Sequence, residues 1–195
     1  MIKLLKAQDY IKMPWKNGAG ITEEVIKVTD YNIDNFLWRV SIADIKEDGT
    51  FSSFIGYQRI ISVLEGKGMV LEVDGKLSRP LSTFDPFAFK GESEVSCKLL
   101  KGPLRDFNLI YNPLSIAANL QWIVNEQPTR IFTNAEDIVL FNAGDKVTVN
   151  ISNQEIVLEH YDTLWVTNQD DLKEVYITTI TNSFKCCFIS LTSKN

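Results

Sequence analysis

The sequence contains one histidine, His160, and this scarcity restricts the metal chemistry open to the chain. A transition-metal site built on imidazole needs two or three histidines gathered in one place. We therefore expect no histidine-based metal centre, and we predict that the protein uses no metal and no other cofactor. A site built from carboxylates alone has no motif to support it. His160 stands beside Tyr161 and Asp162, where we interpret it as a surface or turn residue.

Cysteine is scarce too, since the chain has only Cys97, Cys186 and Cys187. An odd number that includes two adjacent residues is not the pattern of a disulfide framework. In a strand, Cys186 and Cys187 would point to opposite faces of the sheet, so we do not expect them to share a metal ion. This use of cysteine fits a reducing compartment, and we predict a cytoplasmic protein.

Clusters of basic residues and long apolar runs are also absent. The formal net charge is -5 and lysine and arginine are scattered, so we expect neither nucleic acid nor a membrane as a partner. No apolar stretch reaches the length of a membrane span, and residues 1–6 lack the features of a signal peptide. The sequence has no Gly-x-Ser-x-Gly motif, no phosphate-binding glycine loop and no supported Cys–His pair. The absence of these motifs argues against the commonest classes of nucleophilic enzyme and of nucleotide-binding protein.

The sequence does contain repeated alternation of apolar and polar residues. In residues 36–42 the even positions are apolar, while Arg39 and Ser41 lie on the other face of the predicted strand. An Asp74-Gly75 pair predicts a hairpin turn. Residues 116–124 fit both a strand and a helix, and we favour a strand. No long amphipathic helix is evident, so the fold class is all-β. Further strands are predicted at 58–65, 69–74, 86–90, 94–100, 106–111, 138–142, 146–151, 155–159, 163–166, 174–181 and 185–191.

The chain also repeats itself. Residues 63–73 align with 139–149, 81–87 with 158–164, and 94–95 with 174–175. Each copy keeps the order of apolar strand, glycine turn, alternating strand, aromatic-Asp turn and buried strand. Two copies of one β unit predict two stacked barrels or sandwiches. We place the N-terminal one at residues 1–112 and the C-terminal one at residues 113–195, packed as one compact unit, and leave an exchange of strands between them open.

The segment from Trp15 to Glu24 is unusually rich in chemistry. It holds an indole, an amine, a carboxamide, two glycines, a hydroxyl and two carboxylates. We expect a loop here rather than a plain strand, with glycines that bring the backbone close to a ligand or adopt positive φ. The alternative is structural: Trp15 would close one end of a core while Asn17 and Gly18 make a turn.

The motifs of the first half are Trp15-Lys16-Asn17-Gly18-x-Gly20-x-Thr22-x-Glu24, Trp38-Arg39-x-Ser41-x-Ala43, Gly49-x-Phe51-Ser52-x-Phe54-x-Gly56-x-x-Arg59, Leu64-x-Gly66-x-Gly68, Phe87-x-Phe89-x-Gly91 and Gly102-x-x-x-Asp106-Phe107-Asn108. Together they resemble the HutD/Ves family, small bacterial bicupins of the RmlC-like cupin superfamily. One departure is Ala19, where the family often has a third glycine. The resemblance spans residues 1 to about 112. It implies two cupin-like antiparallel β-barrels, or double-stranded β-helices, in one chain. It also implies a link to histidine utilisation, while the biochemical activity of the family is poorly defined.

Polar residues fall at positions that would line the first barrel. Arg39 there would be a buried cation in need of an anionic partner. In one interpretation, Glu24 or Asp106 forms an internal ion pair with Arg39. Asp106 and Asn108, which flank Phe107, could equally mark the start of a strand.

In the other interpretation, Lys16, Arg39 and Arg59 face a pocket that accepts a small carboxylate. A guanidinium grips a carboxylate through two parallel hydrogen bonds. Trp15 and Trp38 would supply the apolar wall. The full set of predicted ligand-binding residues is Trp15, Lys16, Asn17, Gly20, Thr22, Glu24, Arg39, Ser41, Arg59 and Asn108.

Three classes of function stay open. The first is a metal-free protein that binds a small anionic metabolite as a sensor or modulator. The second is a metal-independent enzyme, with Glu24 or Asp106 as the general base and Lys16 or Arg39 stabilising an oxyanion. The third is a structural or protein-interaction role. A homodimer is expected by analogy with cupins that pair through sheet edges.

Overall fold

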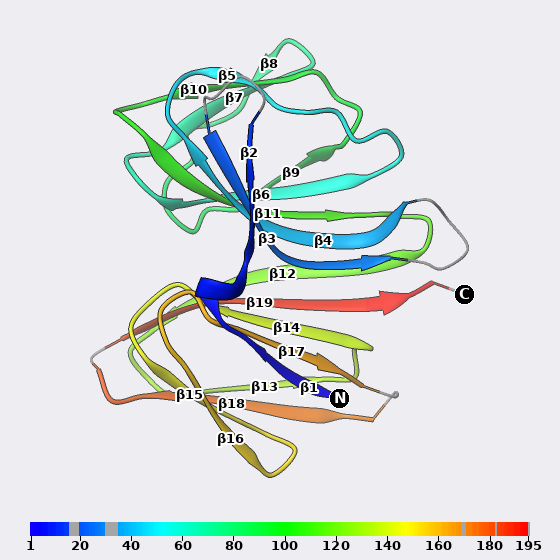
Figure 1. Cartoon of the computed structure of the whole chain (residues 1–195), viewed down its shortest axis with the longest axis vertical. Helices are drawn as coiled ribbons and strands as arrows, with labels where there is room; N and C mark the ends of the chain where they lie inside the picture. The colour runs from blue at the N-terminus through cyan, green and yellow to red at the C-terminus, as the bar shows by residue number, and fades with distance from the viewer. Residues whose placement is uncertain (16–19, 30–34, 169–170, 182, 195) are drawn as a thin grey trace. The chain divides into compact units, whose positions relative to one another are not determined.

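The computed structural model describes residues 1–15, 20–29, 35–168, 171–181 and 183–194. Most of these residues lie in β-strands, and the one helical element among them is the short 3-10 helix η1 (Ala7–Asp9). The described part of the chain therefore holds no helix long and apolar enough to cross a membrane. The chain divides into two compact units, which we call the N-terminal unit (residues 11–116) and the C-terminal unit (residues 1–10 and 117–195) (Figure 1).

The N-terminal unit contains one six-stranded and one four-stranded antiparallel sheet. The larger sheet has the order β2 (Ile11–Pro14), β3 (Gly20–Thr29), β4 (Phe36–Ile45), β11 (Leu104–Tyr111), β6 (Gln58–Glu65) and β9 (Phe87–Lys90). The smaller sheet has the order β5 (Gly49–Thr50), β10 (Val95–Leu99), β7 (Met69–Val73) and β8 (Lys76–Leu77).

The core of the N-terminal unit is formed by side chains from both of its sheets. Ile61 and Val63 of β6 are fully buried, and they belong to the same apolar cluster as Leu71 of β7 and Cys97 of β10. Successive residues of a strand point to opposite faces, so alternate residues of β6 enter this core. Arg59 lies two residues before Ile61 and so continues the same face, which brings a cation to the end of the apolar core.

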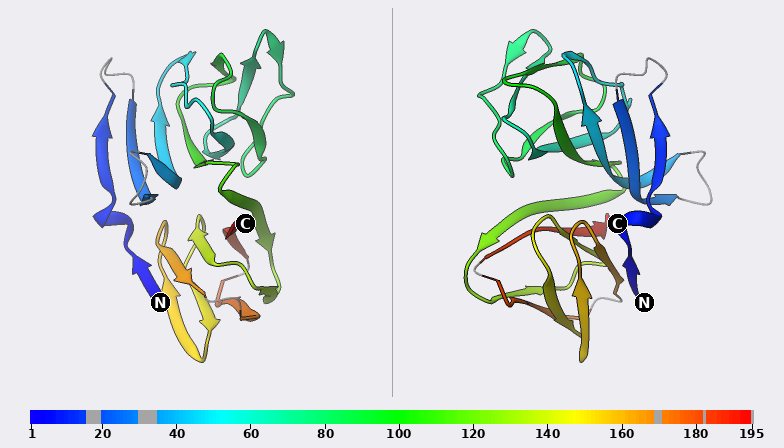
Figure 2. Two further views of the ribbon diagram at one scale, coloured as in Figure 1. Left: turned by 90° about the vertical axis from the view of Figure 1, so that its right-hand side faces the viewer. Right: turned by 60° about the vertical axis from the view of Figure 1, so that its left-hand side comes forward.

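The C-terminal unit has a five-stranded and a four-stranded sheet. In the first, the strand β1 pairs with β17 at one edge (Figure 2). The order of the first sheet is β1 (Ile2–Leu5), β17 (Thr163–Thr167), β14 (Asp137–Asn142), β19 (Phe184–Ser193) and β12 (Ile116–Asn125). The order of the second sheet is β13 (Thr129–Thr133), β18 (Lys173–Thr179), β15 (Val147–Ile151) and β16 (Gln154–Leu158).

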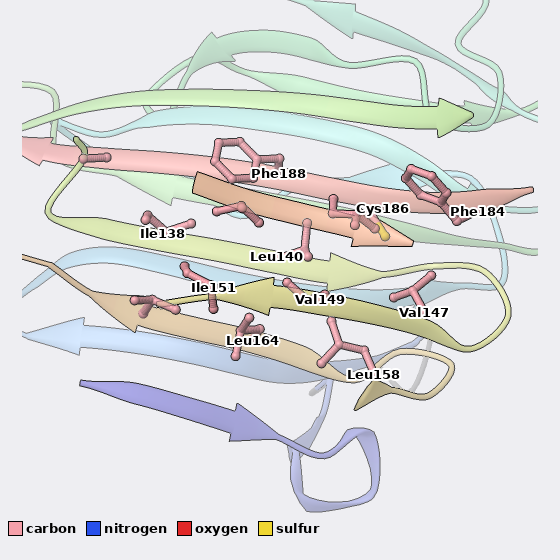
Figure 3. Close-up of a cluster of buried hydrophobic side chains, with 14 residues drawn as sticks. Ile138, Leu140, Val147, Val149, Ile151, Leu158, Leu164, Phe184, Cys186 and Phe188 are labelled. Atoms are coloured by element: carbon pink, nitrogen blue, oxygen red, sulfur yellow. The ribbon is translucent and has the colours of Figure 1, made fainter. Parts of the chain in front are cut away.

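The interior of the C-terminal unit is an apolar cluster built from both sheets (Figure 3). Leu140 of β14 and Cys186 of β19 come from the larger sheet, and Val149 of β15 and Leu158 of β16 come from the smaller one. Each of these side chains is almost completely removed from water. Burial of apolar surface stabilises a fold by about 25 cal/mol per Å², so this cluster is a principal source of stability for the unit.

The two units share one strand order. The order β9-β6-β11-β4 in the N-terminal unit corresponds to β17-β14-β19-β12 in the C-terminal unit, and β5-β10-β7-β8 corresponds to β13-β18-β15-β16. The aromatic-Asp turn is repeated as well, because Phe84 and Tyr161 both have positive φ, at 64° and 66°. Positive φ is uncommon for aromatic residues. The predicted all-β class and the predicted repeat are thereby confirmed.

Two features differ from the sequence predictions. Gly20–Thr29 is a strand, β3, although we expected residues 15–24 to form a loop; its backbone pairs with β2 on one side and β4 on the other. The unit boundaries also differ from 1–112 and 113–195, because residues 1–10 lie in the C-terminal unit. The physical reason is the pairing of β1 with β17, which places Ile2 opposite Val166.

Candidate functional site

The N-terminal unit contains a cavity of about 630 Å³. This volume is in the range of small-molecule sites. The pleat of β4 orients the wall: Arg39, Ser41 and Ala43 line the cavity, while Trp38 and Val40 are fully buried on the other face of the strand. The cavity is lined by Pro14, Trp15, Thr22, Arg39, Ser41, Ala43, Thr50, Phe51, Ser52, Phe54, Arg59, Asp106, Asn108 and Ile110.

Arg59 is the buried cation of this cavity, with 4% of its surface exposed. Its Nη2 donates to Asn108 Oδ1 at 3.0 Å, and its Nη1 donates to the Ser52 carbonyl oxygen at 3.0 Å. The guanidinium carbon also lies 5.2 Å and 5.4 Å from the ring centres of Phe51 and Phe54. Burial lowers the pKa of Arg59 to about 10. Arg59 therefore stays charged at neutral pH and is held in place by hydrogen bonds and aromatic rings.

Asp106 is the buried carboxylate of the same cavity, and it is completely inaccessible to solvent. Its Oδ2 accepts a hydrogen bond from Asn108 Nδ2 at 3.3 Å, whereas its Oδ1 has no hydrogen-bond partner among the described residues. Burial raises the pKa of Asp106 to about 7, although the charge of Arg59, the hydrogen bond from Asn108 and an interaction with the backbone N–H of Ala43 act in the opposite direction. A carboxyl group that titrates near neutrality can exchange a proton under physiological conditions.

Arg39 is half-buried beside the ring of Phe54, with its guanidinium carbon 5.5 Å from the ring centre. Its Nε is buried and makes no hydrogen bond within the described part of the chain. Burial lowers the pKa of Arg39, while the charge of Glu24 raises it. Among the ion pairs of the described residues, none joins Arg39 to Glu24 or to Asp106. The internal ion pair that the sequence offered as an alternative is therefore not formed.

Trp15 closes the cavity next to β3. Its indole Nε1 donates to Thr22 Oγ1 at 2.8 Å. Gly20 makes this arrangement feasible, because a Cβ atom at that position would lie 2.3 Å from the Asp44 carbonyl oxygen and 3.0 Å from the indole ring. Gly20 itself does not line the cavity. Its place in the structure is explained by packing beneath Trp15 and beside β4.

Most of the predicted ligand-binding residues come together at the cavity, but not all of them. Trp15, Thr22, Arg39, Ser41, Arg59 and Asn108 line it. Glu24 lies opposite Ser41 in the register of β3 and β4, but it does not line the cavity. Gly20 does not line it either, because it packs against the indole of Trp15. The prediction that Trp38 supplies apolar wall is wrong, because the pleat turns its indole to the far face of β4. Lys16 and Asn17 lie outside the described residues.

The prediction did not include the two phenylalanines of the wall, Phe51 and Phe54. Phe51 and Phe54 contact Arg59 through their rings, and Ser52 accepts its hydrogen bond. The motif Phe51-Ser52-x-Phe54 was visible in the sequence, but it carries no charge and no strong polar pattern. The signal that could have found these residues is their position shortly before Arg59, since aromatic rings favour arginine as a neighbour.

The side chains of the cavity do not fit a transition metal. Among the described residues that line the cavity, Asp106 is the only carboxylate, and two guanidinium groups share the space with it. A guanidinium has no lone pair to offer a metal ion and repels a cation. Across the described ranges of the chain, no three His, Cys, Asp or Glu side chains gather as a metal site would need. The arrangement is instead suited to an anion.

Comparison with known proteins identifies a matching family and related proteins. The HutD family model matches residues 7–183. The chain is 52% identical over 172 residues to an uncharacterised 21.2 kDa protein in the hutC 3′ region of Pseudomonas putida, covering 88% of this chain and 90% of that protein. It is 34% identical over 148 residues to the protein Ves of Escherichia fergusonii, covering 71% and 76% of the two chains.

Solved structures agree with this result. HutD from Pseudomonas fluorescens SBW25, solved in a formate condition, superposes with a TM-score of 0.88 at 44% identity, and each chain is covered completely. A Cupin 2 conserved barrel domain protein from Leptotrichia buccalis superposes with a TM-score of 0.61 at 9% identity, over 97% of this chain and 96% of the other. At that low identity the likeness shows the fold alone. The predicted cupin-like fold is confirmed.

Proposed function

We propose, from the premise that this chain belongs to the HutD family, that its N-terminal unit binds a small metabolite carrying a carboxylate. The observation that carries the proposal is the pair of guanidinium groups in one cavity, of which Arg39 forms no described ion pair. A cation removed from water in this way needs an anion to compensate it. A ligand carboxylate supplies that anion.

The two arginines have different parts in the proposed binding. Arg59 is fixed by Asn108 and Ser52, so it offers its remaining N–H groups in a preset direction. Among the described residues, Arg39 contacts the rings of Phe36 and Phe54 and feels the charge of Glu24, so its N–H groups are available to a ligand. Together they provide more donors than a single carboxylate can accept, and Ser41 and Thr22 line the same space for other polar atoms of the ligand.

The proposed role is that of a metal-free sensor or modulator connected with histidine utilisation. Support comes from the family and from the Pseudomonas putida relative, whose name places it in the hutC 3′ region. The bound metabolite would then report the state of that pathway. A fixed cation in a cavity with aromatic walls selects a carboxylate over a neutral molecule, which is the property that a sensor needs.

A thermal-shift screen tests this function. The purified protein is heated with intermediates of histidine degradation and with other small carboxylates, and binding raises the melting temperature because the ligand stabilises only the folded state. Arg39→Met should weaken the apparent affinity at least about tenfold, since it removes a charged hydrogen-bonding partner. Arg130→Met is the matched control, because Arg130 is exposed and lies in the C-terminal unit. A folded protein that no carboxylate stabilises would overturn the proposal.

A second function, acid–base catalysis without a metal, is favoured by one observation. The pKa of Asp106 is raised to about 7 by burial, which is suitable for a general base at neutral pH. The same panel of carboxylates, incubated with the protein and followed by mass spectrometry, separates the two functions. Loss of one compound that Asp106→Asn abolishes would establish turnover, whereas stabilisation without loss leaves binding as the function.

A further inference from the structure

We propose that Asp106 takes up a proton when a carboxylate binds in the cavity, so that it meets the ligand as a neutral hydrogen-bond donor. The inference rests on the proposed function and deepens it. It makes Asp106 the residue that discriminates between ligands at this site, although a carboxylate is at first sight an unsuitable neighbour for an anion. The geometric basis is that only one of the two carboxyl oxygens of Asp106 accepts a hydrogen bond from a described residue.

The two oxygens of Asp106 have different surroundings. Oδ2 accepts from Asn108, which in turn receives the N–H groups of Arg59, so this oxygen belongs to a fixed network. Oδ1 is buried and has no described partner, while the residue itself lines the cavity. An ionised Oδ1 would be a buried acceptor with no donor, which is costly. A protonated Oδ1 becomes a donor, and a ligand carboxylate oxygen is the acceptor that it lacks.

The charged groups around Asp106 have opposing effects on its ionisation. From β6, Arg59 favours the ionised form; from β4, Asp44 opposes it, and Arg39 acts on Arg59 as a like charge. Burial raises the pKa of the Cys97 thiol on β10, and the charge of Asp106 raises it further. The charge of Glu24 on β3 raises the pKa of Arg39, against the larger lowering by burial. Burial already raises the pKa of Asp106 to about 7.

A second carboxylate in the same cavity would raise the pKa of Asp106 further. Like charges at short distance disfavour each other's ionised forms, and the positive charge of Arg59 would now be shared between two carboxylates. The ligand stays ionised because it is the stronger acid in this environment, next to two guanidiniums. At a pH above the pKa of Asp106, the proton therefore comes from solvent, one for each carboxylate bound, and binding becomes weaker as the pH rises.

The test measures the dissociation constant of sodium acetate, with sodium benzoate as a second probe, between pH 5.5 and pH 9. Chemical shifts of the arginine Nε–H groups follow the titration by NMR, with chloride keeping the ionic strength constant. We expect a dissociation constant that is level at low pH and rises about tenfold per pH unit above the pKa of Asp106. Asp106→Asn should bind acetate with no such rise, because its amide donates a hydrogen bond at every pH. Acetamide, which is neutral, should bind at least about tenfold more weakly than acetate at pH 6.

The outcomes distinguish this inference from the proposed function. If neither acetate nor benzoate binds at any pH, the carboxylate site itself is overturned and the inference falls with it. If acetate binds with the same dissociation constant at pH 6 and pH 9, only the proton uptake is overturned. Should Asp106→Asn fail to fold, the carbon-13 shift of the Asp106 carboxyl group in the wild-type protein decides. It should move to the protonated value on addition of acetate at pH 8, and no movement would refute the inference.

Discussion

The two units of this protein share a strand order, but their interiors differ. Strands β11 and β19 occupy the same place in their sheets. Counted from the first residue of each strand, the third and fifth residues are Asp106 and Asn108 in β11 but Cys186 and Phe188 in β19. All four side chains are buried. A carboxyl group and a carboxamide in one unit therefore stand where a thiol and a phenyl ring stand in the other.

The neighbouring strands show the same contrast. Arg59 is the second residue of β6 and lies opposite Ile110 of β11. Ile138 is the second residue of β14 and lies opposite Ser190 of β19. A buried arginine in the N-terminal unit thus corresponds to a buried isoleucine in the C-terminal unit. The fold is compatible with an apolar side chain at this position. The polar cluster is therefore not required by the architecture, and its cost in stability has to be explained by function.

The largest expected effect comes from placing the carboxylate in the wrong unit. Cys186→Asp should lower the free energy of unfolding by about 3–5 kcal/mol, because the new charge would be buried with no guanidinium beside it. Cys186 is fully buried in an apolar cluster. Urea denaturation followed by circular dichroism measures the change. Cys186→Ala, which removes the thiol without adding charge, is the control and should cost less; equal losses would mean that burial of charge is not the deciding factor.

The next effect is a pH dependence that belongs to the N-terminal unit. The pKa of Asp106 is raised from 3.8 to about 7 by burial, so the folded state keeps a proton that the unfolded state has released. The free energy of unfolding should therefore fall as the pH rises from about 4 to about 7, by roughly 4 kcal/mol, and then stay level. Urea denaturation at a series of pH values, compared between wild type and Asp106→Asn, isolates this residue because the other titrating groups are shared. Parallel curves for the two proteins would contradict the raised pKa.

A smaller effect is expected when the N-terminal unit is made to resemble its partner in the fold. The triple variant Arg59→Ile, Asp106→Cys, Asn108→Phe copies the C-terminal residues into the cavity. Replacing a buried charged network with apolar side chains is often neutral or stabilising, so the free energy of unfolding should be unchanged or higher by about 1–2 kcal/mol.

The same variant should lose its thermal shift with acetate, which gives a second readout from one protein. Thermal and urea denaturation measure the two properties in parallel. A triple variant that is less stable than wild type by more than about 2 kcal/mol would show that the polar cluster supports the fold rather than a ligand.

Strands that bury one face could be predicted from sequence. Residues 58–65 form β6 with the predicted bounds, and residues 116–124 form β12, because alternation survives wherever one side of the sheet meets a core. The strand β3 was not predicted, since Gly20, Thr22 and Glu24 weaken the usual strand signal. Pairing with neighbours on both sides, which is a tertiary effect, outweighs that local preference.

The candidate site could be predicted in part, for a related reason. Alternation alone predicted that Arg39 and Ser41 share a strand face, and both line the cavity. The network that joins Arg59 to Asp106 through Asn108 could not be predicted, because it depends on the register of β6 against β11. Composition also does not reveal which oxygen of Asp106 lacks a hydrogen-bond partner among the described residues. These properties arise only when strands distant in sequence are aligned.

The pairing of β1 with β17 also has a consequence for the order of assembly during synthesis. Residues 11–116 form a continuous stretch, so the N-terminal unit can fold as soon as the ribosome has released it. The C-terminal unit is discontinuous, and Ile2 must wait for Val166, its partner across the ladder. Closing so long a loop is slow relative to local pairing. The strand that is translated before the N-terminal unit is therefore among the last elements to find its place.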